Sequence, residues 1–273
     1  MMPEPTPTVR ELLAFYLEAG VDCALGEEPV NRLAEPETMP AAPEAAAPPA
    51  PPARAMPAPL PLIRGEPPPA PDAAIASARE AARTAPTLEA LRALLQTFDG
   101  CALRKTATQL VFADGNPQAR VMFVGEAPGR DEDIEGLPFV GRSGKLLDRM
   151  IAAIGLDRSS AYIANVIPWR PPGNRTPTPQ ETQICLPIIR RQIELVNPDM
   201  LVTLGNPSTQ ALLGTREGIM RSRGKWLDYD TGTRVVRALP TFHPAYLLRS
   251  PSYKRMSWQD LRAIAKVLAG VSA

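Results

Sequence analysis

The stretch Val124–Leu146 (VGEAPGRDEDIEGLPFVGRSGKL) decides the fold of this chain. The apolar run Arg120–Val124 predicts a buried strand, which breaks into the turn Gly125–Gly129. Glycine and proline at this density build a rigid turn at the carboxyl end of a strand. Open α/β sheets bind their ligands at such ends. The lone aromatic Phe139 stands between a proline and a valine–glycine pair, so we interpret it as a flat wall for a small planar ligand.

Strands alternate with helices along the chain, which predicts a mainly parallel sheet covered on both faces. The expected strands are Arg120–Val124, Tyr162–Val166, Met200–Leu204 and Leu239–Phe242, and the expected helices are Ser143–Ile154, Pro179–Val196, Ser208–Leu213 and Ser257–Ala269. The runs Lys225–Tyr229 and Arg234–Ala238 flank an Asp-Thr-Gly turn and predict a β-hairpin. Residues 72–98 predict a helical region with a break at Pro86.

Composition divides the 273 residues into a leader and one larger domain. Of the 33 prolines, 14 fall between Pro36 and Pro71, in a segment whose most frequent other residue is alanine. Such a segment cannot bury enough apolar surface to offset the entropy of ordering, so we expect a disordered linker at residues 29–71. Residues 1–28 predict a short helical segment, and residues 72–273 the folded domain.

The net charge of +1 combines an acidic leader with a basic domain. Residues 1–100 carry 7 Lys/Arg and 14 Asp/Glu, a balance of −7, while residues 101–273 carry 23 and 15, a balance of +8. A basic domain favours a polyanionic partner, although a merely well-solvated surface gives the same excess. No apolar run approaches the roughly 20 residues that span a membrane. The N-terminus lacks a secretory signal and the three cysteines are widely spaced, so we expect a cytoplasmic protein, and a monomer.

Loops rich in proline and glycine follow several predicted strands, and they should gather at one edge of the sheet. These loops are Gly125–Gly129, Asn165–Pro172 and His243–Arg249. The Asn165 amide offers a donor and an acceptor together, which can read the edge of a base, although a turn-forming asparagine is an equal alternative. His243 is the only histidine of the chain. A satisfied loop histidine is its alternative reading, but its place at this edge favours a functional one.

The loop Trp169–Arg175 (WRPPGNR) lies just beyond Asn165. Its two prolines make it stiff, and Arg170 and Arg175 carry guanidinium groups suited to phosphates. An exposed charged loop without a ligand is an equal alternative.

Together these motifs resemble the uracil-DNA glycosylases, and most of all the bacterial and archaeal type called family 4, which usually carries an iron–sulfur cluster. The matching stretches are Gly125–Gly129 with Glu132-Asp133, Pro138–Gly141, Tyr162–Asn165, Arg170–Arg175, Arg223–Trp226 and His243–Arg249. They lie in order within residues 98–265. The resemblance implies a three-layer α/β/α sandwich with a central, mainly parallel four-stranded sheet. It also implies an enzyme that flips deoxyuridine out of DNA and hydrolyses the glycosidic bond, leaving an abasic site.

The resemblance implies a uracil pocket made by Gly125, Glu126, Ala127, Phe139, Asn165 and His243. Phe139 would stack on the base, Asn165 would pair with uracil O4 and N3–H, and a neutral His243 would donate a hydrogen bond to O2. The best-known relatives place an aspartate where this chain has Ala127. Glu126 would therefore hold the attacking water or exclude the methyl group of thymine, and it is the second catalytic candidate beside His243.

The resemblance further implies contacts with uracil-containing DNA outside the pocket. Arg170 and Arg175 would bind phosphates. The residues expected to wedge into the minor groove are Tyr246, Leu247, Leu248 and Arg249. A non-catalytic DNA- or lesion-binding module, or a glycosylase for a broader set of deaminated bases, remains an alternative. The amphipathic segment at residues 8–20 would either dock on the domain or bind a repair or replication partner.

The cysteines do not complete the cluster of the similar enzymes, which bind [4Fe–4S] through four thiolates. Aligned by motif, this chain has Phe98, Cys101, Trp169 and Cys185 at the four positions. Cys23 precedes the linker, and even with it the chain has only three thiols. Because four thiolates are the usual requirement, we expect no metal and no cofactor. Phe98 and Trp169 would pack where the inorganic core lies in the relatives, with Cys101 and Cys185 as ordinary buried thiols.

Overall fold

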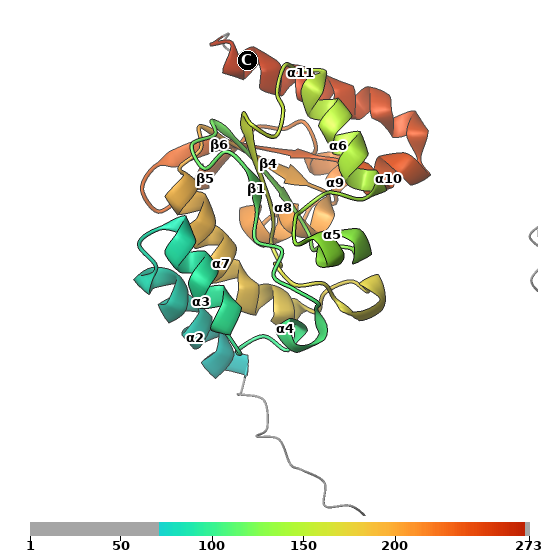
Figure 1. The fold of residues 1–273 in the computed structure, drawn as a ribbon. Coiled ribbons are helices and arrows are strands. Elements are labelled where there is room, and N and C mark those ends of the chain that lie inside the picture. The colour runs from blue at the N-terminus through green and yellow to red at the C-terminus, as the bar shows by residue number, and fades with distance from the viewer. Residues whose placement is uncertain (1–70, 271–273) are drawn as a thin grey trace, which may run out of the picture. The chain divides into compact units, whose positions relative to one another are not determined.

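The computed structural model describes residues 71–270 (Figure 1). The strands are β1 (Asp114–Gly115), β2 (Val121–Gly125), β3 (Ala161–Asn165), β4 (Met200–Leu204), β5 (Leu227–Asp230) and β6 (Val235–Thr241). The α-helices are α2 (Pro71–Thr84), α3 (Leu88–Thr97), α4 (Leu103–Thr106), α5 (Arg130–Glu135), α6 (Arg142–Ala152), α7 (Pro179–Val196), α8 (Asn206–Leu213), α9 (Ile219–Ser222), α10 (Pro244–Arg249) and α11 (Lys254–Leu268). Two turns of 3-10 helix are η1 (Pro172–Asn174) and η2 (Pro251–Tyr253). The segments predicted at residues 1–28 and 29–71 lie outside the described residues, except for Pro71, where α2 begins.

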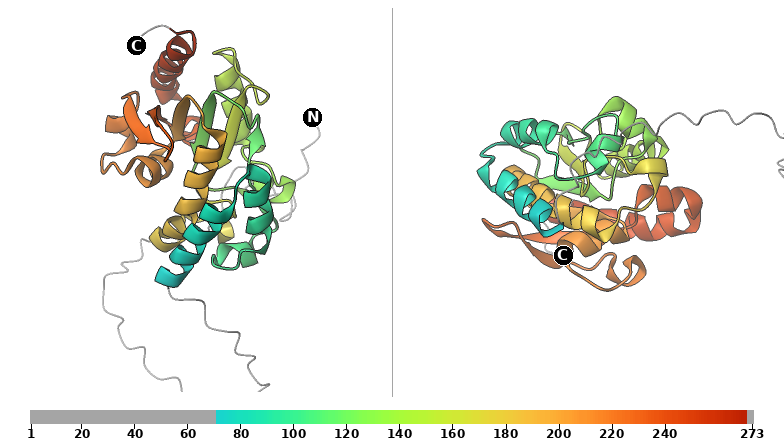
Figure 2. Two further views of the ribbon diagram at one scale, coloured as in Figure 1. Left: turned by 90° about the vertical axis from the view of Figure 1, so that its left-hand side faces the viewer. Right: turned by 90° about the horizontal axis from the view of Figure 1, so that it is seen from below.

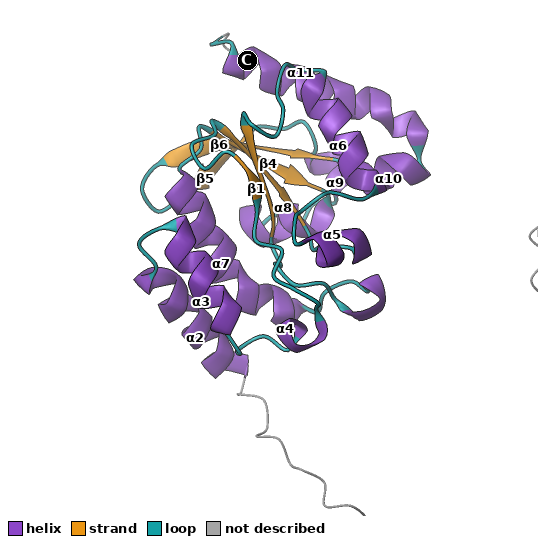
Figure 3. Cartoon of the chain, in the orientation of Figure 1, coloured by secondary structure: helices purple, strands orange, loops and turns teal. Residues whose placement is uncertain are grey.

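The described strands, drawn in orange in Figure 3, form one sheet. Their order is β1-β3-β2-β4-β6-β5. The inner strands β3, β2, β4 and β6 pair in parallel, whereas β1 and β5 pair antiparallel at the two edges. The predicted four-stranded sheet is therefore the parallel centre of a six-stranded one. The edge strand β5 belongs to the predicted hairpin. The edge strand β1 was not predicted, because its two residues, Asp and Gly, carry no apolar pattern.

Helices cover both faces of the sheet, because successive residues of the inner strands face two different hydrophobic clusters. In β2, Met122 and Val124 belong to the cluster that contains residues of α2, α3 and α7. Val121 and Phe123 belong to the cluster that contains residues of α6 and α11. The two sets of helices lie on opposite sides of the strands (Figures 1 and 2). This arrangement confirms the three-layer sandwich, and strands buried on both faces read as continuous apolar runs.

The predicted bounds Pro179–Val196 and Met200–Leu204 match α7 and β4 residue for residue. Helix α7 begins with a capping box, in which Thr178 Oγ1 accepts a hydrogen bond from Glu181 N at 3.2 Å and the Glu181 carboxylate accepts one from Thr178 N at 2.7 Å. It ends at Asn197, which adopts the left-handed conformation common at helix ends. Within residues 71–270, none of the helices combines the length and apolar character needed to cross a bilayer.

Candidate functional site

Three loops that follow strands, called strand-end loops here, meet at the carboxyl ends of the parallel strands. Gly125 and Asn165 are paired at the ends of the neighbouring strands β2 and β3. The pairing continues into the loops, because Ile167 N donates a hydrogen bond to Glu126 O at 3.0 Å. Strand β6 ends two residues before His243. Each loop therefore starts from a fixed point of the sheet, as the sequence analysis expects.

These loops enclose a cavity of about 360 Å³. The predicted site residues that line it are Glu126, Ala127, Phe139, Asn165, Arg175, His243 and Arg249. A larger cavity, of about 770 Å³, lies against α2, α7 and β5, and none of the strand-end loops just described lines it. The smaller cavity is the candidate site, because it gathers an aromatic ring, an amide, an imidazole and a carboxyl.

Gly125 brings the aromatic ring and the amide together. A Cβ at this position would lie 2.5 Å from Asn165 Oδ1 and 2.6 Å from Phe139 Cζ, so any larger residue would displace one or both side chains. The Phe139 ring is buried, and its centroid lies 5.4 Å from that of His243. Asn165 is also buried, and its Oδ1 accepts no hydrogen bond from any described residue. Because a buried acceptor without a partner is costly, Oδ1 is suited to receive a donor from a ligand.

The surroundings of His243 fix the position of its proton. Its Nδ1 accepts a hydrogen bond from Ala245 N at 3.1 Å and so caps α10. A nitrogen that accepts carries no proton, so the neutral imidazole carries its proton on Nε2. Burial, together with the positive charge of Arg249, lowers the pKa of His243 to about 4. Near pH 7, Nε2–H is therefore an uncharged hydrogen-bond donor.

Two carboxyl groups line the cavity, those of Glu126 and Glu132. Glu132 Oε1 accepts hydrogen bonds from Val140 N at 3.1 Å and Gly141 N at 3.0 Å. Its Oε2 accepts one from Gly129 N at 3.1 Å. Both oxygens are thus engaged by the backbone, which leaves Glu126 as the cavity-lining carboxyl that can serve a ligand. Burial raises the pKa of the Glu126 carboxyl.

Arg170 and Arg175 both hold the loop around η1. Arg175 pairs with Glu181 through nitrogen–oxygen distances of 2.8 and 2.6 Å. Arg170 Nε donates a hydrogen bond to Asn174 Oδ1 at 2.7 Å. Arg249, by contrast, is exposed and forms no ion pair with another residue in the described range. Of these arginines, Arg249 has the charge that is least committed to a partner within the domain.

The four residues expected to wedge into a groove lie on α10 and differ in exposure. Leu247 is 1% exposed and packs in the cluster with α6 and α11, whereas Leu248 is 37% exposed. Tyr246 stacks on the Phe242 ring at a centroid distance of 5.4 Å. A helix turns successive side chains about 100° apart, so neighbouring leucines point to core and to solvent. Leu247 therefore packs in the core of the described domain, whereas Leu248 is exposed to solvent.

The four cluster positions lie within one hydrophobic cluster of the core. The rings of Phe98 and Trp169 stack with centroids 6.2 Å apart and planes inclined by 12°. Cys101 and Cys185 are buried and share a hydrogen bond, which lowers the pKa of the Cys101 thiol and raises that of Cys185. Among residues 71–270, no three Cys, His, Asp or Glu side chains are grouped to hold a metal ion. Two thiols beside two stacked rings do not fit a cluster that requires four thiolates.

The sequence patterns assign no role to three residues that line or support the site. Ser143 lines the cavity at the start of α6. No local pattern identifies it, because Ser143 lies two residues after the N-cap Gly141 and does not cap the helix. Glu132 belongs to a matching motif, but the motif does not reveal the backbone groups it binds. Arg158 gives no local signal, because the aspartates that it binds lie 10 and 44 residues away in the sequence.

Known proteins are similar to this chain over the residues that form the site. The family model of the uracil DNA glycosylase superfamily matches residues 112–262. A type-4 uracil-DNA glycosylase of Archaeoglobus fulgidus is 40% identical over 171 residues, which are 61% of this chain and 86% of the relative. The type-4 enzyme of Thermotoga maritima is 42% identical over 164 residues, 59% of this chain and 84% of the relative. The residues matched by the family model include all three strand-end loops.

Proposed function

Since the chain belongs to the uracil-DNA glycosylase superfamily, among the type-4 enzymes, we propose that it removes uracil from DNA. One observation carries the proposal: Asn165, whose Oδ1 has no hydrogen-bond partner among residues 71–270, lines the same cavity as Phe139 and His243. An acceptor, an aromatic plate and a neutral donor are the groups that a flipped uracil requires. The location in the cytoplasm, the monomeric state and a partner for residues 8–20 stay predictions.

Base selection rests on Asn165. Its Oδ1 would accept from uracil N3–H, and its Nδ2 would donate to O4. In cytosine, the position of O4 carries an amino group and N3 has no hydrogen. Two donors would then face each other and two acceptors would face each other, so cytosine is rejected. Phe139 would stack on either base and contributes binding rather than this choice.

Bond cleavage rests on His243. As the bond between C1′ and N1 breaks, its electron pair moves onto the uracil ring and O2, and positive charge develops on the sugar. Nε2–H would donate to O2 and stabilise the leaving anion without transferring its proton. The hydrogen bond from Ala245 N to Nδ1 holds the ring in the tautomer that this step needs.

Water then adds to the sugar cation. Its oxygen bonds to C1′, and one of its two protons is released. Glu126 is the cavity-lining carboxyl that remains for orienting this water, since Ala127 has no titratable group. Its raised pKa suits a group that positions water and accepts its proton. Electrostatic stabilisation of the uracil anion supplies most of the catalysis in this proposal.

Beyond the contacts with the base, we propose that Arg249, Leu248 and Tyr246 of α10 enter the groove, while a place there for the buried Leu247 stays a prediction. Arg170 and Arg175 keep their proposed place near phosphates and also stiffen the loop that bears them. The basic balance of residues 101–273 supports a DNA partner.

We further propose that the domain works without an iron–sulfur cluster, its place being taken by the stacked rings of Phe98 and Trp169. Iron analysis of anaerobically purified protein should find less than stoichiometric iron, with no absorbance band at about 400 nm. Stoichiometric iron with that band would contradict the proposal. A Cys101→Ser variant purified in parallel would then show whether the thiol holds the metal.

An excision assay on an oligonucleotide with one uracil tests the function. The full-length wild type should release uracil, whereas His243→Ala and Asn165→Ala should each lose about 10²- to 10³-fold in single-turnover rate. Asn197→Gly is the matched control. It removes an amide just before β4, at the amino ends of the parallel strands and away from the cavity, and glycine still allows the left-handed conformation that ends α7. Tight DNA binding without excision by the wild type would favour the non-catalytic binding module.

A further inference from the structure

Phe139 holds an unusual backbone conformation, with φ of 56°. Residues other than glycine rarely adopt this left-handed region, and they persist there where the surroundings over-determine them. Gly144 of α6 makes room for it, since a Cβ at this position would lie 1.6 Å from the Phe139 carbonyl oxygen. The direction of the Phe139 ring therefore depends on the groups that hold its backbone.

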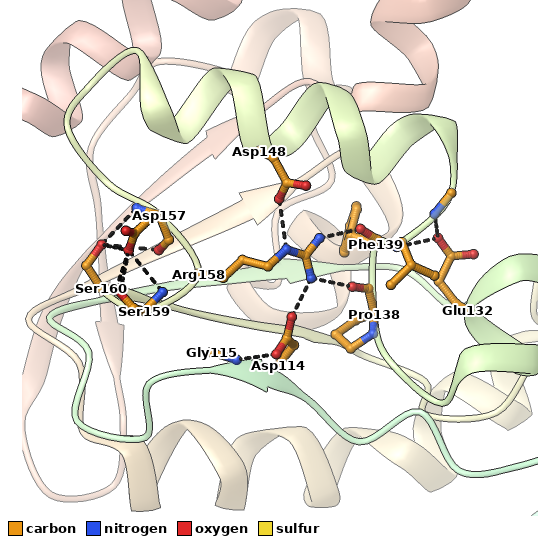
Figure 4. Close-up of polar contacts among 12 residues, drawn as sticks. Asp114, Gly115, Glu132, Pro138, Phe139, Asp148, Asp157, Arg158, Ser159 and Ser160 are labelled. Carbon is orange, nitrogen blue, oxygen red and sulfur yellow. Dashed lines mark hydrogen bonds and ion pairs between the residues drawn. The ribbon is translucent and has the colours of Figure 1, made fainter.

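Arg158, from the loop between α6 and β3, binds both carbonyl groups that flank the Phe139 Cα (Figure 4). Its Nη1 donates to Pro138 O at 3.1 Å, and its Nη2 donates to Phe139 O. The first oxygen belongs to the peptide before Cα and the second to the peptide after it. One rigid, planar guanidinium thus sets the relative orientation of the two peptide planes, which is what φ and ψ of Phe139 describe.

The guanidinium is itself held by two carboxylates. Nη1 lies 2.5 Å from Asp114 Oδ2 on β1, and Nε lies 2.9 Å from Asp148 Oδ1 on α6. Burial alone would lower the pKa of Arg158, but the hydrogen bonds to these aspartates raise it. The arginine therefore stays charged and joins an edge strand and a helix to the loop that carries Phe139.

Glu132 holds the same loop from its other side, by accepting hydrogen bonds from Val140 N and Gly141 N. The peptide between Phe139 and Val140 is thereby fixed at its oxygen by Arg158 and at its nitrogen by Glu132. Arg158 does not line the cavity, so it acts on the loop and makes no direct contact with a ligand there.

We propose that Arg158 is a positioning residue for uracil excision, which acts by fixing the Phe139 backbone and hence the plane on which the base stacks. The inference rests on the proposed function. It predicts that removing the Arg158 side chain slows excision only while residue 139 carries an aromatic ring.

The experiment measures single-turnover excision by full-length protein in four forms: wild type, Arg158→Ala, Phe139→Ala and the double variant. Arg158→Ala should lose about 10- to 100-fold in rate, the scale of a misplaced reacting group, while its affinity for DNA without uracil stays within about twofold. In the Phe139→Ala background, the same change should cost less than about threefold, because the ring is already gone. Added guanidinium ion should restore part of the rate of Arg158→Ala only.

Arg234→Ala is the matched control, because this arginine also binds two consecutive carbonyl groups, those of Asn197 and Pro198, at the opposite edge of the sheet. It should leave the rate unchanged even where it lowers the melting temperature. Arg158→Lys covers the case that Arg158→Ala does not fold, since lysine keeps the charge but cannot bridge both carbonyls, and it too should lose rate. Equal losses in both backgrounds, or an equal loss in Arg234→Ala, would overturn the inference. A wild type without excision would overturn the proposed function instead, and with it this inference.

Discussion

At the scale of single residues, His243 offers a direct test, because it is the only histidine of the chain. The hydrogen bond from Ala245 N to Nδ1 and the pKa of about 4 predict a neutral, Nε2-protonated ring across the physiological range. Nuclear magnetic resonance of the ¹⁵N-labelled ring in the folded protein should show this tautomer down to about pH 5. Titration near pH 6.5, the ordinary histidine value, would contradict the proposed donor role.

The same lowered pKa has a consequence for stability. Between pH of about 6.5 and 4, the unfolded chain binds a proton at His243 that the folded protein does not bind. The free energy of unfolding should therefore fall as the pH decreases through this window. His243→Asn keeps a good helix cap but cannot titrate, so its pH profile should lack this contribution. Comparing the two profiles removes the carboxylate titrations that both proteins share.

The Asn165 side chain is expected to lower the stability of the protein while it serves the proposed function. Its Oδ1 is buried without a partner among the described residues, so the apo protein bears the cost of a desolvated acceptor. Asn165→Leu replaces the amide by an apolar group of similar shape. We expect excision to fall by about 10²-fold or more, while the melting temperature stays level or rises. Calorimetry and the single-turnover assay check both parts, and a melting temperature lowered by several degrees would show that Oδ1 has a structural partner.

At the scale of elements, local sequence predicts those parts whose signals are local. Helix α7 carries its capping box in Thr178 and Glu181, so its first residue is readable from the sequence. The strand ends that bring Asn165 and His243 together follow from the parallel topology. Strand β1 is not readable, because two polar residues become a strand only by pairing with β3. Likewise, the positive φ of Phe139 depends on distant groups, so the sequence identifies this residue but not its conformation.

The core around α3, α4 and α7 should depend on Trp169. This side chain is 1% exposed and stacks on Phe98. Trp169→Ala should lower the free energy of unfolding by about 3–5 kcal/mol, because it removes a large buried side chain and leaves a cavity. Trp258 of α11 is 43% exposed, so Trp258→Ala should change the free energy of unfolding by about 0.5 kcal/mol or less. Urea unfolding measures both. Equal, small effects would mean that the stacked pair does not support the core.

At the scale of the whole molecule, charge and topology have separate parts in the proposed binding of DNA. The balance of +8 in residues 101–273 gives the domain a general attraction for a polyanion. In the proposed function, the strand-end loops then select what is bound, because they hold the groups that would read a base. If so, affinity and selection depend on different residues, and we expect that they can be changed separately.

This separation predicts how salt acts on binding. Each phosphate contact releases counterions, so the logarithm of the binding constant falls linearly with the logarithm of salt concentration. Arg249 is exposed and has no ion-pair partner within residues 71–270, so Arg249→Ala should weaken DNA binding and reduce the magnitude of this slope by about 1. Arg175 is already neutralised by Glu181, so Arg175→Ala should change the slope less. Fluorescence anisotropy of labelled DNA at several salt concentrations measures both slopes. An equal effect of the two variants would mean that the Arg175–Glu181 pair opens when DNA binds, and that the loop around η1 carries phosphate contacts of the same weight as α10.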